Sequence, residues 1–154
     1  TQSRSSAASD VYKRQQVRHV SRLFVTAASL RVPTFSVVLR KGYGLGAMGM
    51  TAGGFHAPVF TVAWPTGEFG AMGLEGAVRL GFRKELEALP EGAERDALFA
   101  KLLAKSYANG EAMHMAATLE IDAVIDPADT RAWLARGLAS AQVAPLGHRF
   151  VDTW

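Results

Sequence analysis

Four glycines fall within eight positions, 42–49, and this glycine-rich segment has the residue types best suited to chemistry. Residues 44–49 fit the pattern G-x-G-x-x-G, in which backbone N–H groups at a helix start bind the pyrophosphate of a dinucleotide. The same segment can aim two successive N–H groups at one point and stabilise an oxygen that becomes negative during a reaction. A purely structural hypothesis is that the glycines let a helix pack closely on a strand.

The surroundings of the glycine-rich segment disfavour a dinucleotide site. Arg40, Lys41 and Tyr43 separate the preceding apolar run from the first glycine of the pattern. Glu68, which would bind the ribose, follows a turn at Pro65 instead of ending a strand. The chain also has few further strand–helix units, so an oxyanion-stabilising turn and a structural turn are the two interpretations that stay open.

The remaining reactive side chains form no recognisable cluster. The histidines lack metal-ligand spacing, so no metal site is expected, and His56 is interpreted as a packed histidine with one ring nitrogen hydrogen-bonded. No serine lies in a Gly-x-Ser-x-Gly turn, which disfavours a serine nucleophile. Glu68 is either an exposed turn carboxylate or a buried acid with a perturbed pKa. Three methionines are expected to fill the core: Met48, Met50 and Met72.

Strand and helix patterns alternate along the chain around these residues. Short runs of β-branched and aromatic residues predict strands at 34–39, 59–64, 69–72 and 123–125. Helical spacing of apolar residues predicts helices at 16–30, 75–89, 91–107 and 130–141, with a short helix after the glycine-rich segment. Asp126 and Pro127 are helix-start signals for the last of these. The alternation indicates an α/β fold.

The composition is that of one globular domain. The chain has 154 residues, 49% hydrophobic and 20% charged, and this length suffices to bury a core. It contains no cysteine, which excludes disulfides, thiolate metal sites and a cysteine nucleophile. No apolar run approaches the ~18 residues of a membrane span and no signal-peptide pattern is present, so we expect a cytoplasmic protein.

Basic residues concentrate near the N-terminus. Residues 1–31 carry six positive side chains and one negative, whereas the rest of the chain carries 11 positive and 13 negative. Residues 1–15 are rich in serine and alanine and end in Asp-Val-Tyr-Lys-Arg-Gln, which resembles translated sequencing-adapter DNA. We interpret them as an adapter-derived or disordered leader on a metagenomic fragment. Without this leader the charge is nearly balanced, so nucleic-acid binding is not expected.

Four blocks of sequence follow one another in a specific order and spacing. They are Val32-Pro33, RKGYGLGAMGM at 40–50, AWPTGEFGAMGLEGAV at 63–78 and IDAVIDPADTR at 121–131. Together they resemble the carboxyltransferase component of biotin-dependent acyl-CoA carboxylases, the acetyl-, propionyl- and methylcrotonyl-CoA carboxylase family. The resemblance implies a crotonase-like (ClpP/crotonase) spiral of ββα units, of which residues 16–154 would form a partial C-terminal carboxyltransferase domain.

The resemblance implies that a carboxyl group moves from N1 of biotin to the α-carbon of a short acyl-CoA, of the acetyl-CoA or propionyl-CoA type. In this family, backbone N–H groups after the Arg-Lys-x-Tyr-Gly signature stabilise charge on the biotin ureido oxygen. By position these donors are Leu45 and Gly46, with Gly44 beside them in the cofactor site. Met48, Tyr43 and Gly44 are implied in the substrate pocket. Leu45 departs from the family's usual glycine but can still donate its N–H.

The resemblance also implies partners. These are an N-terminal carboxyltransferase half, a biotin carboxyl carrier protein and a biotin carboxylase, in a dimer or hexamer, with no nucleic acid, membrane or metal. Because the second oxyanion hole belongs to the N-terminal half, we expect the chain to be inactive alone. Two alternatives stay open: a crotonase-like acyl-CoA hydrolase or isomerase that needs no biotin, and an inactive truncated product.

Overall fold

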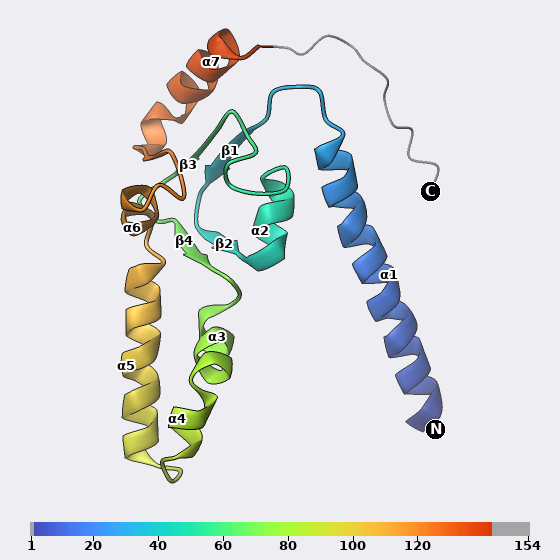
Figure 1. Cartoon of the computed structure of the whole chain (residues 1–154), viewed down its shortest axis with the longest axis vertical. Helices are drawn as coiled ribbons and strands as arrows, with labels where there is room; N and C mark the ends of the chain where they lie inside the picture. The colour runs from blue at the N-terminus through green and yellow to red at the C-terminus, as the bar shows by residue number, and fades with distance from the viewer. Residues whose placement is uncertain (1, 143–154) are drawn as a thin grey trace.

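Five short strands form two parallel sheets in residues 2–142, the part of the chain that the computed structural model describes, with side chains from residue 15 onward (Figure 1). The strands are β1 Phe35–Val38, β2 Lys41–Tyr43, β3 Phe60–Ala63, β4 Glu68–Gly70 and β5 Ala123–Val124. The larger sheet has the order β1-β3-β5, and the smaller pairs β2 with β4. In the register, Phe35 lies opposite Phe60, and Lys41 opposite Glu68.

The central strand β3 is buried along its whole length. A parallel strand covered on both faces favours a continuous apolar run, and Phe60, Val62 and Ala63 supply it. The polar member, Thr61, is fully hydrogen-bonded: its hydroxyl donates to the Phe55 carbonyl at 2.6 Å, and its backbone N–H donates to the Asp122 carboxylate at 2.7 Å. The strand therefore carries no unpaired buried side-chain group.

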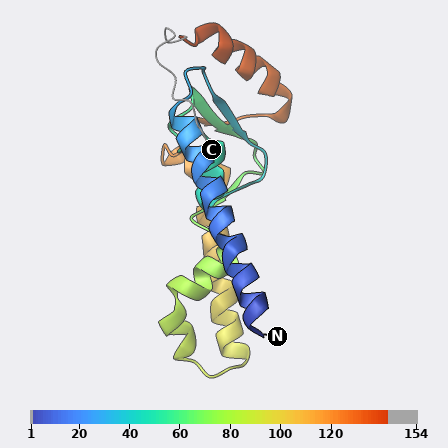
Figure 2. The ribbon, with the colours of Figure 1, turned by 90° about the vertical axis from the view of Figure 1, so that its right-hand side faces the viewer.

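A helical hairpin extends from the sheets. α3 Leu74–Gly81 and α4 Arg83–Glu87 run outward, and α5 Ala93–Asn109 returns beside them (Figures 1 and 2). α3 buries Leu74 and Val78, whereas α5 has no fully buried residue. α6 Ala112–Ala117 follows and contacts β4 and β5. The hairpin is thus attached to the sheets mainly through its base.

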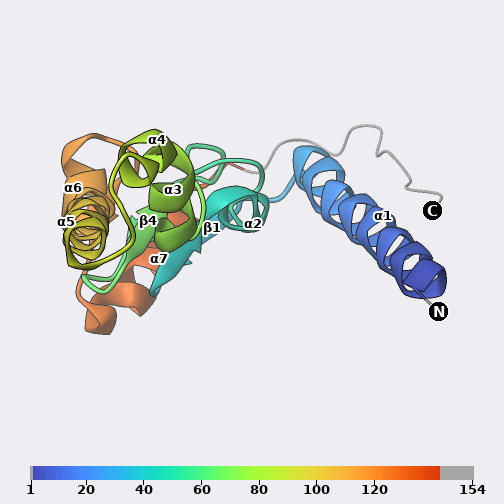
Figure 3. The same ribbon diagram turned by 90° about the horizontal axis from the view of Figure 1, so that it is seen from below.

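Two further helices lie at the other side of the sheets. α2 Gly44–Met50 follows β2 directly, and the long α1 Gln2–Ala28 stands away from the sheets and meets α2 (Figure 3). Gly49 permits this contact, because a Cβ there would lie 2.9 Å from the Leu23 side chain. None of the helices within residues 2–142 is both long and apolar enough to cross a bilayer.

The last helix begins at the predicted signals and packs on the larger sheet through a glycine. Asp126 precedes the short turn η1 Pro127–Asp129, and its carboxylate accepts the Ala128 N–H at 2.8 Å. α7 Thr130–Ser140 continues from this turn. Its buried residue is Gly137, which faces the rings of Phe35 and Phe60.

The α/β prediction is confirmed, but local predictions differ from the structure at four places. The glycine-rich segment itself contains β2 and α2, because Gly44 turns strand directly into helix. The predicted helix 75–89 breaks at Phe82, next to Gly81, a poor helix former. The predicted helix 16–30 begins at Gln2 and ends at Ala28, so it includes the backbone of most of the interpreted leader. α6 was not predicted, because its six residues are too few to show a helical period of apolar side chains.

Gly137→Ala is expected to destabilise the fold, although alanine has the higher helix propensity. A Cβ at this position would lie 2.5 Å from the Phe60 ring and 2.7 Å from the Phe35 ring, so the helix must shift. We expect the free energy of unfolding in urea to fall by ~1–3 kcal/mol. The control is Gly76→Ala in α3, where the nearest atom is 3.8 Å away and a gain of about 0.5–1 kcal/mol is expected. Equal effects would contradict close packing at Gly137.

Candidate active site

The first turn of α2 presents the two backbone N–H groups that the sequence predicts as donors. Tyr43 precedes the helix in an extended conformation (φ −108°, ψ 134°), and Leu45 and Gly46 are its second and third residues. N–H groups in the first turn of a helix have no carbonyl partner inside it. Within residues 2–142, neither N–H donates to a backbone carbonyl outside the helix. Both donors are therefore available to an external acceptor.

The turn into α2 requires glycine at position 44. Gly44 has a φ of +59°, in the left-handed region, and a Cβ there would lie 2.8 Å from the Ala71 carbonyl oxygen. That oxygen belongs to the backbone beyond β4 and cannot rotate away. The glycine-rich segment therefore allows a close backbone contact, which is a structural role, and it also presents the two available N–H groups.

The predicted site residues line two cavities. Gly44, Leu45 and Met48 line a cavity of about 800 Å³, here called the main cavity. Tyr43 and Gly46 line a second cavity of about 780 Å³ against β1 and β2. The structure thus brings all five residues together in sequence and space but divides them between two cavities.

Residues from β4, α3 and α5 complete the main cavity. Phe69 and Leu74 contribute apolar side chains from β4 and α3, and Ser106 and Asn109 contribute polar ones from the end of α5. Phe69 and Leu74 lie in the block 63–78, so the sequence did contain a signal that they lie near the site. Ser106 and Asn109 had no such signal, because their position at the main cavity depends on how the hairpin returns to the sheets.

A tyrosine–carboxylate hydrogen bond lies at the start of α2. The Tyr43 hydroxyl donates to Glu68 Oε2 at 2.9 Å. Burial, together with this bond, raises the pKa of Tyr43 to about 12. Glu68 is the first residue of β4 and half-buried, so neither proposed description of it, exposed turn carboxylate or buried acid, was right.

Two expectations about packed side chains were also wrong. His56 is exposed and lines the main cavity. The three methionines have exposed fractions of 38%, 78% and 43% at Met48, Met50 and Met72. α2 packs on α1 through Gly49, which leaves its methionine side chains outside the core. Among the described residues no group of histidines and acids could hold a metal ion.

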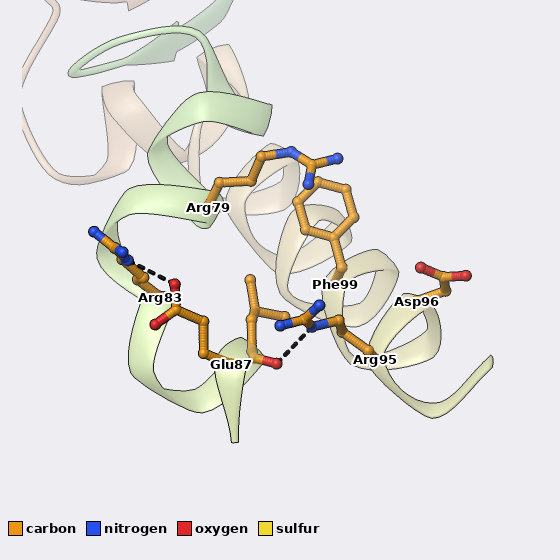
Figure 4. Close-up of a pocket in the computed structure, with 7 residues that line it drawn as sticks. Arg79, Arg83, Glu87, Arg95, Asp96 and Phe99 are labelled. Atoms are coloured by element: carbon orange, nitrogen blue, oxygen red, sulfur yellow. Dashed lines mark hydrogen bonds and ion pairs between the residues drawn. The ribbon is translucent and has the colours of Figure 1, made fainter. Parts of the chain in front are cut away.

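A third cavity, of about 320 Å³, lies within the hairpin and is rich in arginine (Figure 4). Arg83 pairs with Glu87 at 2.7 Å, and Arg95 donates to a carbonyl of α4 at 2.7 Å. The Arg79 guanidinium lies 4.5 Å from the centroid of the Phe99 ring. The Arg79 and Arg95 contacts join α3 and α4 to α5, and the Arg83–Glu87 pair lies within α4, so the arginines have a structural role here.

Residues 6–150 match the family described as the carboxyl transferase domain. The chain belongs to this family. It is 36% identical over 124 residues to the methylmalonyl-CoA carboxyltransferase 12S subunit of Propionibacterium freudenreichii subsp. shermanii. It is 35% identical over 135 residues to the biotin-dependent acetyl-/propionyl-coenzyme A carboxylase beta6 subunit of Mycobacterium tuberculosis. The alignments cover 79% and 86% of this chain but 23% and 28% of those proteins, so the chain spans about a quarter of their length.

Solved structures of the carboxyl transferase family have the same fold. A single-chain, multi-domain long-chain acyl-CoA carboxylase aligns with a TM-score of 0.68 and 53% identity, over 82% of this chain and 12% of that one. The transcarboxylase 12S hexamer aligns with a TM-score of 0.73 and 31% identity, over 88% and 26%. The expected crotonase-like α/β fold is confirmed.

The residues around α2 fit the biotin and acyl-CoA chemistry of this family. The ureido oxygen of biotin accepts hydrogen bonds, and Leu45 and Gly46 present N–H donors that have no other backbone partner in the described chain. Glycine, alanine and apolar side chains dominate the lining of the main cavity, which suits an uncharged ring system.

Removal of the Tyr43 hydroxyl should remove a phenol with a raised pKa. The pKa of about 12 lies above the ordinary value of 10.0, so the neutral phenol is favoured in the folded state. The resulting stabilisation is complete below pH 10 and is lost as the pH rises toward 12. Absorbance titration of the phenolates should therefore lack the transition near pH 12 in Tyr43→Phe. Loss of a transition near pH 10 instead would contradict the effect of the Tyr43–Glu68 bond on this phenol.

Gly44→Ala should destabilise the fold by ~1–3 kcal/mol, because alanine would adopt a left-handed conformation against the Ala71 carbonyl. The matched substitution is Gly46→Ala two residues later, where no atom lies within 4 Å of an added Cβ. That variant should be as stable as the parent or up to about 1 kcal/mol more stable. Urea denaturation measures both, and similar losses would argue against a special backbone at Gly44.

Proposed function

We propose that the chain forms the biotin-receiving side of a carboxyltransferase site, which moves a carboxyl group from carboxylated biotin to the α-carbon of a short acyl-CoA. In this proposal residues 16–154 are part of a C-terminal carboxyltransferase domain, and residues 1–15 are a leader derived from adapter sequence. The observation that carries it is the pair of available N–H groups in a chain of the carboxyl transferase family: Leu45 lines the main cavity, and the adjacent Gly46 lines the second cavity.

The two N–H groups would act as an oxyanion hole. Biotin, carried on a partner protein or domain, would supply the carboxyl group as the bond between that group and N1 breaks, and N1 would take up the proton lost by the acyl α-carbon. The Leu45 and Gly46 N–H groups would donate to the ureido oxygen on which charge develops. Because the turn holds these donors in place before the reaction, they stabilise that charge with little reorganisation. Gly44 contributes by allowing a close approach to the backbone.

The main cavity supports a short, apolar acyl group as the second substrate. Met48 lies in its wall with an exposed fraction of 38%, and its unbranched thioether side chain adapts to different shapes. Acetyl-CoA and propionyl-CoA are both compatible with such a wall. The names of the relatives include methylmalonyl-CoA, acetyl- and propionyl-CoA enzymes.

The proposed partners complete the site. They are an N-terminal carboxyltransferase half, a biotin carboxyl carrier protein and a biotin carboxylase. A dimer or hexamer is the proposed assembly, supported by the hexamer named for transcarboxylase 12S. We place the reaction in the cytoplasm. The chain alone is expected to be inactive, because the oxyanion hole for the thioester enolate would belong to the N-terminal half.

The test is a chimera in which this chain replaces the aligned segment of the 12S subunit. The chimera is supplied with carboxylated biotin and either acetyl-CoA or propionyl-CoA, and the carboxylated thioester is measured by mass spectrometry. We expect product from the chimera and none from the 154-residue chain. Thioester hydrolysis or isomerisation without biotin would favour the crotonase-like alternative, and a folded chimera without turnover would refute the proposal.

The role of the backbone donors is tested by Leu45→Pro in the same chimera. Proline removes the N–H, and the loss of one oxyanion donor should lower kcat by about 10²–10³-fold. Leu45→Ala is the matched control because it removes the side chain but keeps the N–H, and its loss should be much smaller. Equal losses would show that the side chain, not the backbone N–H, matters at this position.

A further inference from the structure

The residues of α2 give the start of this helix little stability of their own. The helix has seven residues, three of them glycine, and such a short glycine-containing helix has little intrinsic stability. Tyr43, at its N-cap position, makes no side-chain hydrogen bond to the helix. The far end is better secured, because the Thr51 hydroxyl donates to the Ala47 carbonyl at 3.0 Å. The direction of the Leu45 and Gly46 N–H groups must therefore be set from outside the helix.

The Tyr43–Glu68 hydrogen bond is placed to do this. In the β2–β4 register Tyr43 lies opposite Gly70, so its ring reaches diagonally across the sheet to Glu68, two positions along β4. The Glu68 backbone N–H in turn donates to the Arg40 carbonyl at 2.6 Å. Glu68 is thus fixed to the strand that leads into α2, and its side chain holds the residue from which the helix starts.

We propose that Glu68 is a positioning residue for carboxyl transfer: by accepting the Tyr43 hydroxyl it fixes the entry into α2 and so the direction of the Leu45 and Gly46 N–H groups. This inference rests on the proposed function. Glu68 lines neither cavity, and Tyr43 lines the second cavity beside Gly46, so Glu68 acts through Tyr43 and the backbone and not on the substrates. The phenol stays protonated at neutral pH, which keeps the bond intact during turnover.

The chain contains a matched control for this pair. Tyr107 in α5 donates its hydroxyl to Glu75 in α3, also at 2.9 Å. That bond joins two helices of the hairpin, and although Tyr107 and Glu75 lie near enough to Tyr43 to raise its pKa, they make no hydrogen bond to it. Tyr43→Phe and Tyr107→Phe therefore remove the same kind of bond, one at the entry into α2 and one between α3 and α5.

The activity test uses the chimera described above. Tyr43→Phe and Glu68→Ala should each lower kcat by about tenfold, the effect of one lost hydrogen bond, with the KM for acyl-CoA changed less than about twofold. The double variant should be no worse than either single variant, and Glu68→Gln, which keeps an acceptor oxygen, should recover most of kcat. Tyr107→Phe should retain the parent kcat. Additive losses in the double variant, or equal losses in the two tyrosine variants, would overturn the inference.

A second readout does not need turnover. In the 154-residue chain, amide hydrogen exchange of Met48–Met50, whose N–H groups bond inside α2, should accelerate in Tyr43→Phe and Glu68→Ala, by about fivefold or more, and not in Tyr107→Phe. Unchanged exchange in the first two variants would overturn the positioning role whether or not the chimera is active. Faster exchange with an inactive parent chimera would leave the positioning of α2 standing and refute the proposed function alone.

Discussion

The contact between Gly44 and the Ala71 carbonyl is the constraint on which the rest of the site depends. The chain leaves β2, turns through a left-handed residue and enters α2 within one position, and a backbone oxygen 2.8 Å from any added Cβ leaves room only for glycine. Because of this turn, the N–H groups of the next two residues lie in the first helical turn and lack partners inside it. The proposed chemistry therefore depends on glycine at position 44, because glycine adopts this left-handed conformation without strain.

The sheets provide the rigid frame for that turn. β3 is buried throughout, and its neighbours β1 and β5 pair with it in parallel, so the chain leaves these strands at the same edge. β2 begins three residues after β1 ends, and β4 continues from the turn after β3. The second sheet is consequently positioned by the first, and the Tyr43–Glu68 bond completes its attachment to α2. The buried strand β3 thus helps to fix the position of α2 through the second sheet.

Much of the fold could be predicted from the sequence, and the failures have identifiable causes. The runs 34–39 and 59–64 gave strands because β-branched and aromatic residues suit buried parallel strands, and Asp126 capped the helix turn as expected. The helix within 44–50 was missed because its glycines disfavour helix locally and only the tertiary contacts at Gly44 and Gly49 stabilise it. Tyr43–Glu68 and Asn109 had no local signal, since both depend on segments that meet only in the folded chain.

The separation in sequence between β3 and β5 has a consequence for how the molecule tolerates change. The Thr61 N–H is bound by Asp122, 61 residues later, and the whole helical hairpin lies in the loop between them. The entropy of closing such a loop rises only slowly with its length. Insertions or deletions at the outer tip of the hairpin, near 88–92, therefore cost the sheets little, and this is where lineages of the fold can diverge in length without disturbing the turn at Gly44.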